Sequence, residues 1–305
     1  MSLLSLIFAL LIEQLRPLNP QRWVVAPLAR LANWTEARLN AGEARHGVLA
    51  WCVLTLLLVL VTGGVFAALA AINPLLALAW NVVVLYVTMG FRQVSHFFTD
   101  IHVALRMGEL ERARAILGEW RGRSASGLAS SDIARLAIEE ALVASHRNVF
   151  AVIFWFVVLP GPCGAVLYRV SEQLARTWRA DAHGEAFAAF AQQAFAWIDW
   201  LPQRITAVCF AIVGDFEDAV YCWRTQAERW ANHGAGIILS SGAGALGVRL
   251  GMPVVESGEL TERPDIGLGE EADVDFMQST IGLVWRALVV WLLILLLVSV
   301  ASWIG

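Results

Sequence analysis

Two long apolar runs constrain this chain more than any other feature of its sequence. Gly47 to Ile72 carries no charge, and Ile281 to Ile304 carries only Arg286. Each run exceeds the ~20 residues that a helix needs to cross a hydrocarbon core of about 30 Å. The chain is 58% hydrophobic and 16% charged, whereas an ordinary soluble domain is roughly 45–50% apolar. We therefore predict an all-α, polytopic helical membrane protein.

Shorter apolar segments suggest the rest of the topology. Asn73-Pro74 ends the first run and Leu75 to Phe91 follows it, so the two runs are predicted to form a helical hairpin. Leu3 to Ile12 is predicted to be a weak N-terminal span or an interfacial helix. Val149 to Tyr168, which a Pro-Gly-Pro sequence interrupts, and Ile205 to Val213 either both cross or both dip and return. Such a break at membrane depth must be shielded by protein or water.

The placement of arginine predicts which side of the membrane the linkers occupy. The segment 16–45 holds five arginines and the segment 92–147 holds eight. A hairpin between them puts both on one face, which the positive-inside rule makes cytoplasmic.

The hydrophilic parts show helical periodicity, so we expect amphipathic cytoplasmic helices. One such face comprises Leu110, Ala113, Leu117 and Trp120. Between Gly251 and Asp275 the periodicity is lost, and a loop is predicted. We divide the chain into N-terminal membrane helices (1–91), a helical region with embedded segments and a glycine-rich loop (92–280), and a C-terminal transmembrane helix (281–305).

Composition excludes several classes of function. All 22 basic residues are arginine, and without lysine the chain can form neither a P-loop nor a Schiff base. The net charge of −4 argues against nucleic acid as a partner. The four cysteines are scattered without metal-binding spacing, so we interpret them as reduced structural thiols.

A glycine-rich run lies near the C-terminal end of the hydrophilic region. Gly242, Gly244 and Gly247 satisfy G-x-G-x-x-G, but Pro253 follows too soon for the long helix of a dinucleotide site. Two alternatives remain open. The run forms a turn whose amides bind an anion beside Arg249, or its small residues serve tight packing.

Three other polar clusters each have a functional and a structural alternative. Carboxylates and imidazoles can bind metals, and basic helix ends can contact phosphate, but such residues more often bond locally or face solvent. The clusters are His96/Asp100/His102, Asp215/Glu217/Asp218 and His146-Arg147-Asn148.

Several short segments, in order from about Arg92 to the C-terminus, resemble motifs of the cobalamin-biosynthesis CobD/CbiB family. The most specific is Ala243-Gly-Ala-Leu-Gly-Val-Arg-Leu-Gly-Met-Pro253, which is similar to the family's A-G-A-L-G-V-R-L-G-G-P. The others are the helix 109–123, Glu140, Tyr168-Arg169, Trp200-Leu201-Pro202-Gln203-Arg204 and Pro264-Asp265-Ile266-Gly267. The resemblance implies a membrane synthase that joins the aminopropanol arm, or its phosphate, to a propionate of cobyric acid, with ATP and Mg²⁺.

The sequence departs from the family's pattern at several acidic positions. The family's E-N-T-S-D-G aligns with Ala144 to Val149, and its Y-K-A-I-N-T-L-D aligns with Tyr168 to Ala175. Because most of the candidate Mg²⁺ ligands that the resemblance implies are replaced, these losses argue against full activity.

The chain also resembles AmpE, a regulatory relative of the family, through Leu11-Ile12-Glu13-Gln14-Leu15 and Ile198-Asp199-Trp200-Leu201-Pro202. This resemblance implies a non-enzymatic sensor of the cell envelope or the beta-lactamase response, in the bacterial inner membrane. A third alternative, a transporter, is disfavoured because charges within the apolar runs are almost absent.

For the synthase we predict one polar pocket. Glu140 orients the ligand and Glu172 is a candidate metal ligand, and both are predicted catalytic residues. Arg249 acts as a phosphate clamp and Arg204 as a second anion contact, together with the glycines of 242–247. No metal site is assigned. Expected partners are the lipid bilayer, a corrinoid or phosphate-bearing ligand and, as an open alternative, a second copy of the chain.

Overall fold

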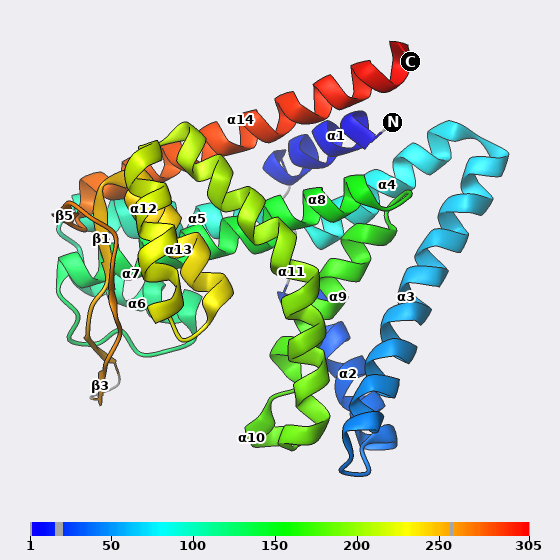
Figure 1. Ribbon diagram of the computed structural model, residues 1–305, viewed down its shortest axis with the longest axis horizontal. Helices are drawn as coiled ribbons and strands as arrows, with labels where there is room; N and C mark the ends of the chain where they lie inside the picture. The colour runs from blue at the N-terminus through cyan, green and yellow to red at the C-terminus, as the bar shows by residue number, and fades with distance from the viewer. Residues whose placement is uncertain (1, 16–20, 257–258, 305) are drawn as a thin grey trace. The chain divides into compact units, whose positions relative to one another are not determined.

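The computed structural model describes residues 2–15, 21–256 and 259–304 (Figure 1). Helices dominate it, which confirms the predicted all-α class. The chain forms two compact units. Unit 1 comprises Met1–Gln93 and Ala151–Pro202, and unit 2 comprises Val94–Phe150 and Gln203–Gly305. The three-part division at residues 91 and 280 rests on apolar runs and motifs, and it stays a prediction.

Unit 1 is built around the predicted hairpin. Its elements are α1 (Ser2–Leu15), a π-helical turn (Gln21–Val25), α2 (Ala26–Leu39), α3 (Ala44–Ile72), α4 (Pro74–Thr88), α8 (Ala151–Val158), α9 (Cys163–Thr177), α10 (Ala180–His183) and the first part of α11 (Glu185–Val213). The Asn73 side chain caps α4 by accepting from the Leu75 amide at 2.8 Å, and Pro74 occupies the first helical turn, where its missing N–H costs nothing. Across the hairpin, Trp80 Nε1 donates to the Thr62 carbonyl at 3.2 Å.

The core of unit 1 lies where α2, α3, α9 and α11 meet. Trp178 is fully buried, stacks edge-on against Phe187 at 5.0 Å and donates from Nε1 to the Ala32 carbonyl at 3.3 Å. Small residues let the helices approach, as at Gly47, where a Cβ would lie 2.2 Å from the Phe187 carbonyl oxygen. Packing therefore fixes α3 against α11, and the end of α9 against α2 and α11.

The Pro-Gly-Pro break separates α8 from α9, and α3 covers it. Gly161 adopts φ +60° with Phe66 of α3 beside it, so that a Cβ would lie 2.8 Å from the ring. Cys163 Sγ donates to the Val59 carbonyl at 3.8 Å. The break is thus shielded by protein, as a break at membrane depth requires.

Unit 2 combines helices with short strands. Its elements are most of α5 (Phe91–Arg106), α6 (Leu110–Arg121), α7 (Ser130–Ser145), the π-helical turn η2 (His146–Phe150), the end of α11, α12 (Phe216–Gln226), the 3₁₀ turn η3 (Ala227–Arg229), α13 (His233–Leu246), β1 (Val248–Gly251), β2 (Val254–Glu256), β3 (Glu259–Thr261), β4 (Asp265–Ile266), β5 (Glu270–Glu271) and α14 (Val274–Ile304). β1 pairs antiparallel with β4 and parallel with β5, and β2 pairs antiparallel with β3.

The strands correct the predicted loop between Gly251 and Asp275. Runs of two to four residues are too short to show an alternating pattern, and tertiary contacts rather than periodicity hold them. β1 and β4, for example, are joined at Leu250 and Ile266, both of which are fully buried.

Three helical stretches are long and apolar enough to cross a membrane: Ala44–Ile72, Ser130–Val158 and Val274–Leu297. The first and third correspond to the two runs that define the chain. The second joins α7, η2 and α8 into one helical stretch, whereas the sequence assigned its first half to a cytoplasmic helix because that half carries charged residues. Together with the exposed leucines of α3, such as Leu60 at 69% exposure, these stretches define a polytopic helical membrane protein.

Candidate functional site

Two of the motif segments, Val248–Gly251 (V-R-L-G) and Pro264-Asp265-Ile266-Gly267 (P-x-I-G), meet on one face of α7 in unit 2. Glu139 is buried there, and its Oε1 accepts from the Gly251 amide at 2.9 Å and from Arg263 Nη2 at 2.7 Å. Arg263 Nη2 also donates to the Gly251 carbonyl at 2.9 Å. The side chains of Glu139 and Arg263 are only 8% and 12% exposed. A single buried ion pair therefore ties α7 to the end of β1.

The backbone at this point requires glycine. Gly251 has φ +79°, and a Cβ would lie 1.9 Å from the Pro264 carbonyl oxygen. The guanidinium of Arg263 lies over the Trp230 ring at 5.3 Å, in a cation–π arrangement. The Gly267 amide donates to Gln226 Oε1 at 2.6 Å. The late Pro-x-Ile-Gly segment is thereby fixed beside the V-R-L-G segment.

One turn earlier on α7, a second polar contact reaches the same segment. Arg135 donates from Nη2 to Asp132 Oδ1 at 2.7 Å and from Nη1 to Met252 Sδ at 3.4 Å. Met252 has φ +66°, a left-handed conformation that disfavours side chains with a Cβ. The family motif that this segment resembles has glycine here.

We expect Met252→Gly to raise the free energy of unfolding by about 1 kcal/mol. The left-handed conformation costs a non-glycine residue about 1–2 kcal/mol, and the Arg135–sulfur contact that is lost is weak. Met252→Ala is the matched control, because it removes the sulfur but keeps the strain. A glycine variant no more stable than the alanine variant, by unfolding measured in bicelles, would contradict the prediction.

Sequence reasoning selected Glu140, whereas the buried carboxylate is its neighbour Glu139. Glu140 is half-buried and forms no hydrogen bond or ion pair with the described residues. A usable signal was present: Glu139 lies three residues from each of Leu136 and Leu142, on the apolar stripe of the helix. A carboxylate on that stripe must be buried and therefore paired.

Arg249 lies on β1, beside the same segment. Its Nη2 lies 3.2 Å from Glu271 Oε1, in an ion pair whose side chains are 37% and 67% exposed. Its Nε is buried and has no hydrogen-bond partner among the described residues. Arg204 lies on α11 and is half-buried, and burial lowers the pKa of its guanidinium. A ligand role for either arginine stays a prediction.

The glycines of 242–247 do not form a loop, which corrects that part of the expectation. Gly242 and Gly244 lie inside α13, and Gly247 caps the helix with φ +67°, its amide donating to the Ala243 and Gly244 carbonyls. A Cβ on Gly242 would lie 2.8 Å from Leu142, and one on Gly244 would lie 2.4 Å from the Asp218 carbonyl oxygen. These two glycines therefore serve close helix packing. An anion-binding role for the run is untested.

Glu172 belongs to unit 1, on α9. Its side chain is 3% exposed and lies 2.6 Å from both Arg169 Nη1 and Arg176 Nη2. Arg169 Nε also donates to the Thr88 carbonyl at 2.8 Å, and Tyr168 Oη donates to Asp199 Oδ1 at 3.0 Å. The motif positions of α9 thus form a buried polar network of their own. Glu140, Arg204 and Arg249 belong to unit 2, so a pocket shared with Glu172 stays a prediction.

Two of the three other polar clusters have local partners. His146 is buried within η2, with Nδ1 3.0 Å from Thr206 Oγ1. Asp215 caps α12 by accepting from the Asp218 amide at 3.0 Å. Burial is the main cause that lowers the pKa of His102, and Arg106 acts in the same direction. Within the described part of the chain no three His, Cys, Asp or Glu side chains converge, so we assign no set of metal ligands.

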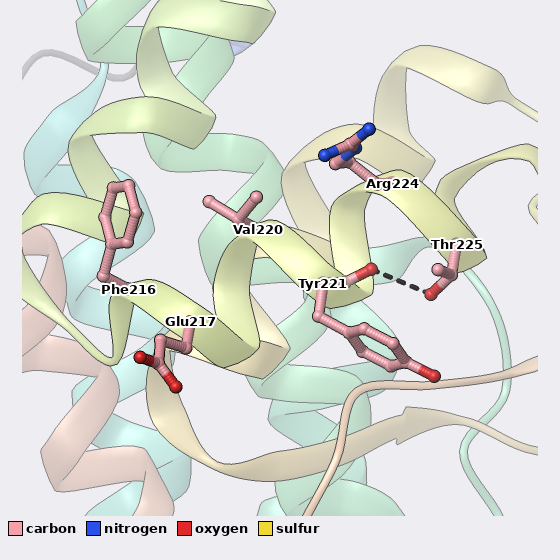
Figure 2. Close-up of a pocket in the computed structure, with 6 residues that line it drawn as sticks. All are labelled: Phe216, Glu217, Val220, Tyr221, Arg224 and Thr225. Carbon is pink, nitrogen blue, oxygen red and sulfur yellow. Dashed lines mark hydrogen bonds between the residues drawn. The ribbon is translucent and has the colours of Figure 1, made fainter.

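An open hollow of about 600 Å³ lies on the outer side of α12. Its lining comes from this helix alone, and Thr225 Oγ1 donates to the Tyr221 carbonyl at 2.8 Å within it (Figure 2). Glu217 of the acidic cluster lines the hollow, but none of the residues predicted for the synthase pocket does, so the candidate site remains the contact between α7 and the segment that follows α13.

The fold and these contacts define a polytopic helical membrane protein whose motif segments converge on a buried carboxylate. A profile of the CobD/Cbib protein family matches residues 6–284, and the chain belongs to this family. It is 35% identical to the cobalamin biosynthesis protein CobD of Stutzerimonas stutzeri, over 96% of both chains. It is also 35% identical to the CobD of Chromobacterium violaceum, over 72% of this chain and 70% of that relative.

A more distant CobD, from Mycobacterium tuberculosis, is 29% identical over 78% of each chain. No solved structure matches the chain. These relatives carry the cobalamin name, and the resemblance to AmpE finds no support among them.

Proposed function

We propose that this protein acts in cobalamin biosynthesis in the bacterial inner membrane. The step is the ATP-dependent joining of the aminopropanol arm, or its phosphate, to a propionate of cobyric acid. The observation that carries the proposal is the family match over residues 6–284, together with 35% identity over 96% of the chain. The arginine-rich segment 16–45, and the part of 92–147 that precedes the stretch Ser130–Val158, are then cytoplasmic.

ATP and the propionate of cobyric acid are anionic, and arginine supplies every fixed positive charge among the side chains. Arg249 suits a phosphate because its Nε is buried without a partner and its ion pair with the exposed Glu271 is exchangeable. Arg204 is the second candidate for an anion contact. Glu140 is half-buried and has no partner among the described residues, so its carboxylate is available to orient an incoming amine.

The described carboxylates do not form an evident site for Mg²⁺. Glu139 is paired with Arg263, and Glu172 is paired with Arg169 and Arg176. Each negative charge is already neutralised by arginine, so neither glutamate is a ready ligand for a hard cation. We therefore route no step of the reaction through a metal ion held by these residues.

A deletion strain of the source bacterium tests the proposed function. Growth that depends on cobalamin should fail when cobyric acid is the precursor and should recover with cobinamide, which already carries the arm. Plasmids that encode the wild type and Arg249→Gln provide the complementation arms, and Arg286→Gln on the last span is the control. Normal growth on cobyric acid, with an altered response to beta-lactams, would instead favour the regulator.

A further inference from the structure

The second half of α11 has an apolar outer face that unit 2 leaves uncovered. Val208 and Ile212 are 42% and 58% exposed, whereas Ala207, Phe210 and Ala211 on the opposite face are buried. In a helix at the surface of a soluble protein the exposed face is polar. Here the exposed face carries large aliphatic side chains one turn apart, so its surroundings are apolar.

The contacts of the buried face show where this segment lies relative to the membrane-crossing stretches. Phe210 contacts Phe150 edge-on, with 6.0 Å between ring centroids, and Phe150 stacks on Trp291 at 6.4 Å. Phe150 lies within the stretch Ser130–Val158 and Trp291 within Val274–Leu297, two of the stretches able to cross a membrane. Phe210 therefore contacts the first of these stretches directly, and Phe150 links it to the second.

The position of Trp291 along α14 gives its approximate depth below the membrane–water interface. Trp285 and Arg286 are both exposed, and this pairing of residue types is common at a membrane–water interface. Trp291 lies six residues farther along the helix, which is about 9 Å at 1.5 Å per residue. At that depth the medium is hydrocarbon, so a side chain exposed beside Trp291 contacts lipid.

The segment does not cross the bilayer by itself. Ile205 to Val213 is nine residues long in the sequence, which is about 13 Å of helix against a hydrocarbon core of about 30 Å. Arg204 precedes it, and Gly214 and the capping Asp215 follow it, so polar groups bound it on both sides. We propose that Ile205–Val213 is inserted in the hydrocarbon region as a partial segment, with Val208 and Ile212 against lipid acyl chains.

A second copy of the chain is the less suitable occupant. A stable protein interface uses about 20–30 residues on each side, whereas the part of this face that belongs to unit 2 offers only two large exposed side chains, Val208 and Ile212. The lipid assignment also gives this face the same medium as the exposed aliphatic residues of α14, such as Leu293 at 53% exposure.

Nitroxide accessibility in the full-length protein tests this proposal. A keto amino acid is introduced at Ile212 and labelled with a hydroxylamine nitroxide, which leaves the native cysteines in place. The protein is reconstituted in nanodiscs of phosphatidylethanolamine and phosphatidylglycerol, and Val208 serves as a second label site. Leu293 provides the lipid reference, and the exposed Glu217 of α12 provides the aqueous one.

We expect the ratio of oxygen to nickel-chelate collision rates at Ile212 to match that at Leu293 and to exceed that at Glu217. A ratio at both label sites equal to that at Glu217 would place the face in water and overturn the proposal. Low accessibility to both reagents would show that a protein, such as a second copy, covers the face. That result would equally overturn the proposal. The proposed enzymatic function does not depend on either result.

Discussion

Replacing Glu139 with alanine should lower the free energy of unfolding by about 3–5 kcal/mol, the usual cost of removing one partner from a buried ion pair. The Arg263 side chain is only 12% exposed, so its charge would remain buried without its carboxylate. The Gly251 amide, 2.9 Å from Glu139 Oε1, would lose its acceptor as well. Steric trapping in bicelles measures the change directly.

Glu140→Ala is the matched control for this experiment. It removes the same side chain one residue away, where the carboxylate is half-buried and has no described partner, so we expect a change of less than about 1 kcal/mol. The double variant Glu139→Leu with Arg263→Met should recover part of the loss, because it leaves no buried charge. Equal effects of the two alanine variants would show that the ion pair does not hold α7 to β1.

Gly164→Ala should destabilise unit 1 by about 3 kcal/mol or more, at the upper end of the range for overpacked cores. The new Cβ would lie 1.8 Å from the Trp155 carbonyl oxygen and 2.4 Å from its carbon, so backbone rather than a mobile side chain must move. The same carbonyl accepts from the Leu159 amide at 3.1 Å at the end of α8. Relief of the clash therefore disrupts the turn between α8 and α9, and thermal unfolding in detergent should show a lower midpoint.

Gly64→Ala is the control for the glycine at 164. It lies in α3, where a Cβ would meet no atom within 4 Å, and alanine favours a helix over glycine by about 1 kcal/mol. We expect this variant to be as stable as the wild type or slightly more stable. If Gly164→Ala were equally well tolerated, the close approach of α8 and α9 would not be a packing constraint.

Much of the helical fold could be predicted because hydrophobic length is a property of contiguous residues. The hairpin of α3 and α4, and the last span, follow from uninterrupted apolar runs and from Asn73-Pro74. The stretch Ser130–Val158 was missed because its first half carries Asp132, Arg135 and Glu139. Asp132 and Arg135 pair with each other within α7, and Glu139 pairs with Arg263 far along the chain. The composition of a segment does not show whether its charged side chains are paired in the fold.

The candidate site could be predicted in part, because its motifs are also runs of contiguous residues. The V-R-L-G and P-x-I-G segments were recognised, and the structure brings them together around Gly251 and Pro264. The glycines at 242 and 244 were ambiguous, because close helix packing and anion binding both require a missing Cβ. Which of Glu139 and Glu140 is buried depends on the face that α7 turns to the core, and Glu139 is held there by the Gly251 amide, 112 residues away in the chain. The role of Glu140 at the site stays a prediction.

The most direct test of the account is amide formation by the purified full-length protein in nanodiscs. With cobyric acid, aminopropanol or its phosphate, and magnesium ATP, mass spectrometry should detect the corresponding cobinamide product, and its formation should require ATP. The CobD of Stutzerimonas stutzeri, 35% identical over 96% of both chains, is the parallel control. If that relative forms the product and this protein forms none, the proposed reaction is contradicted.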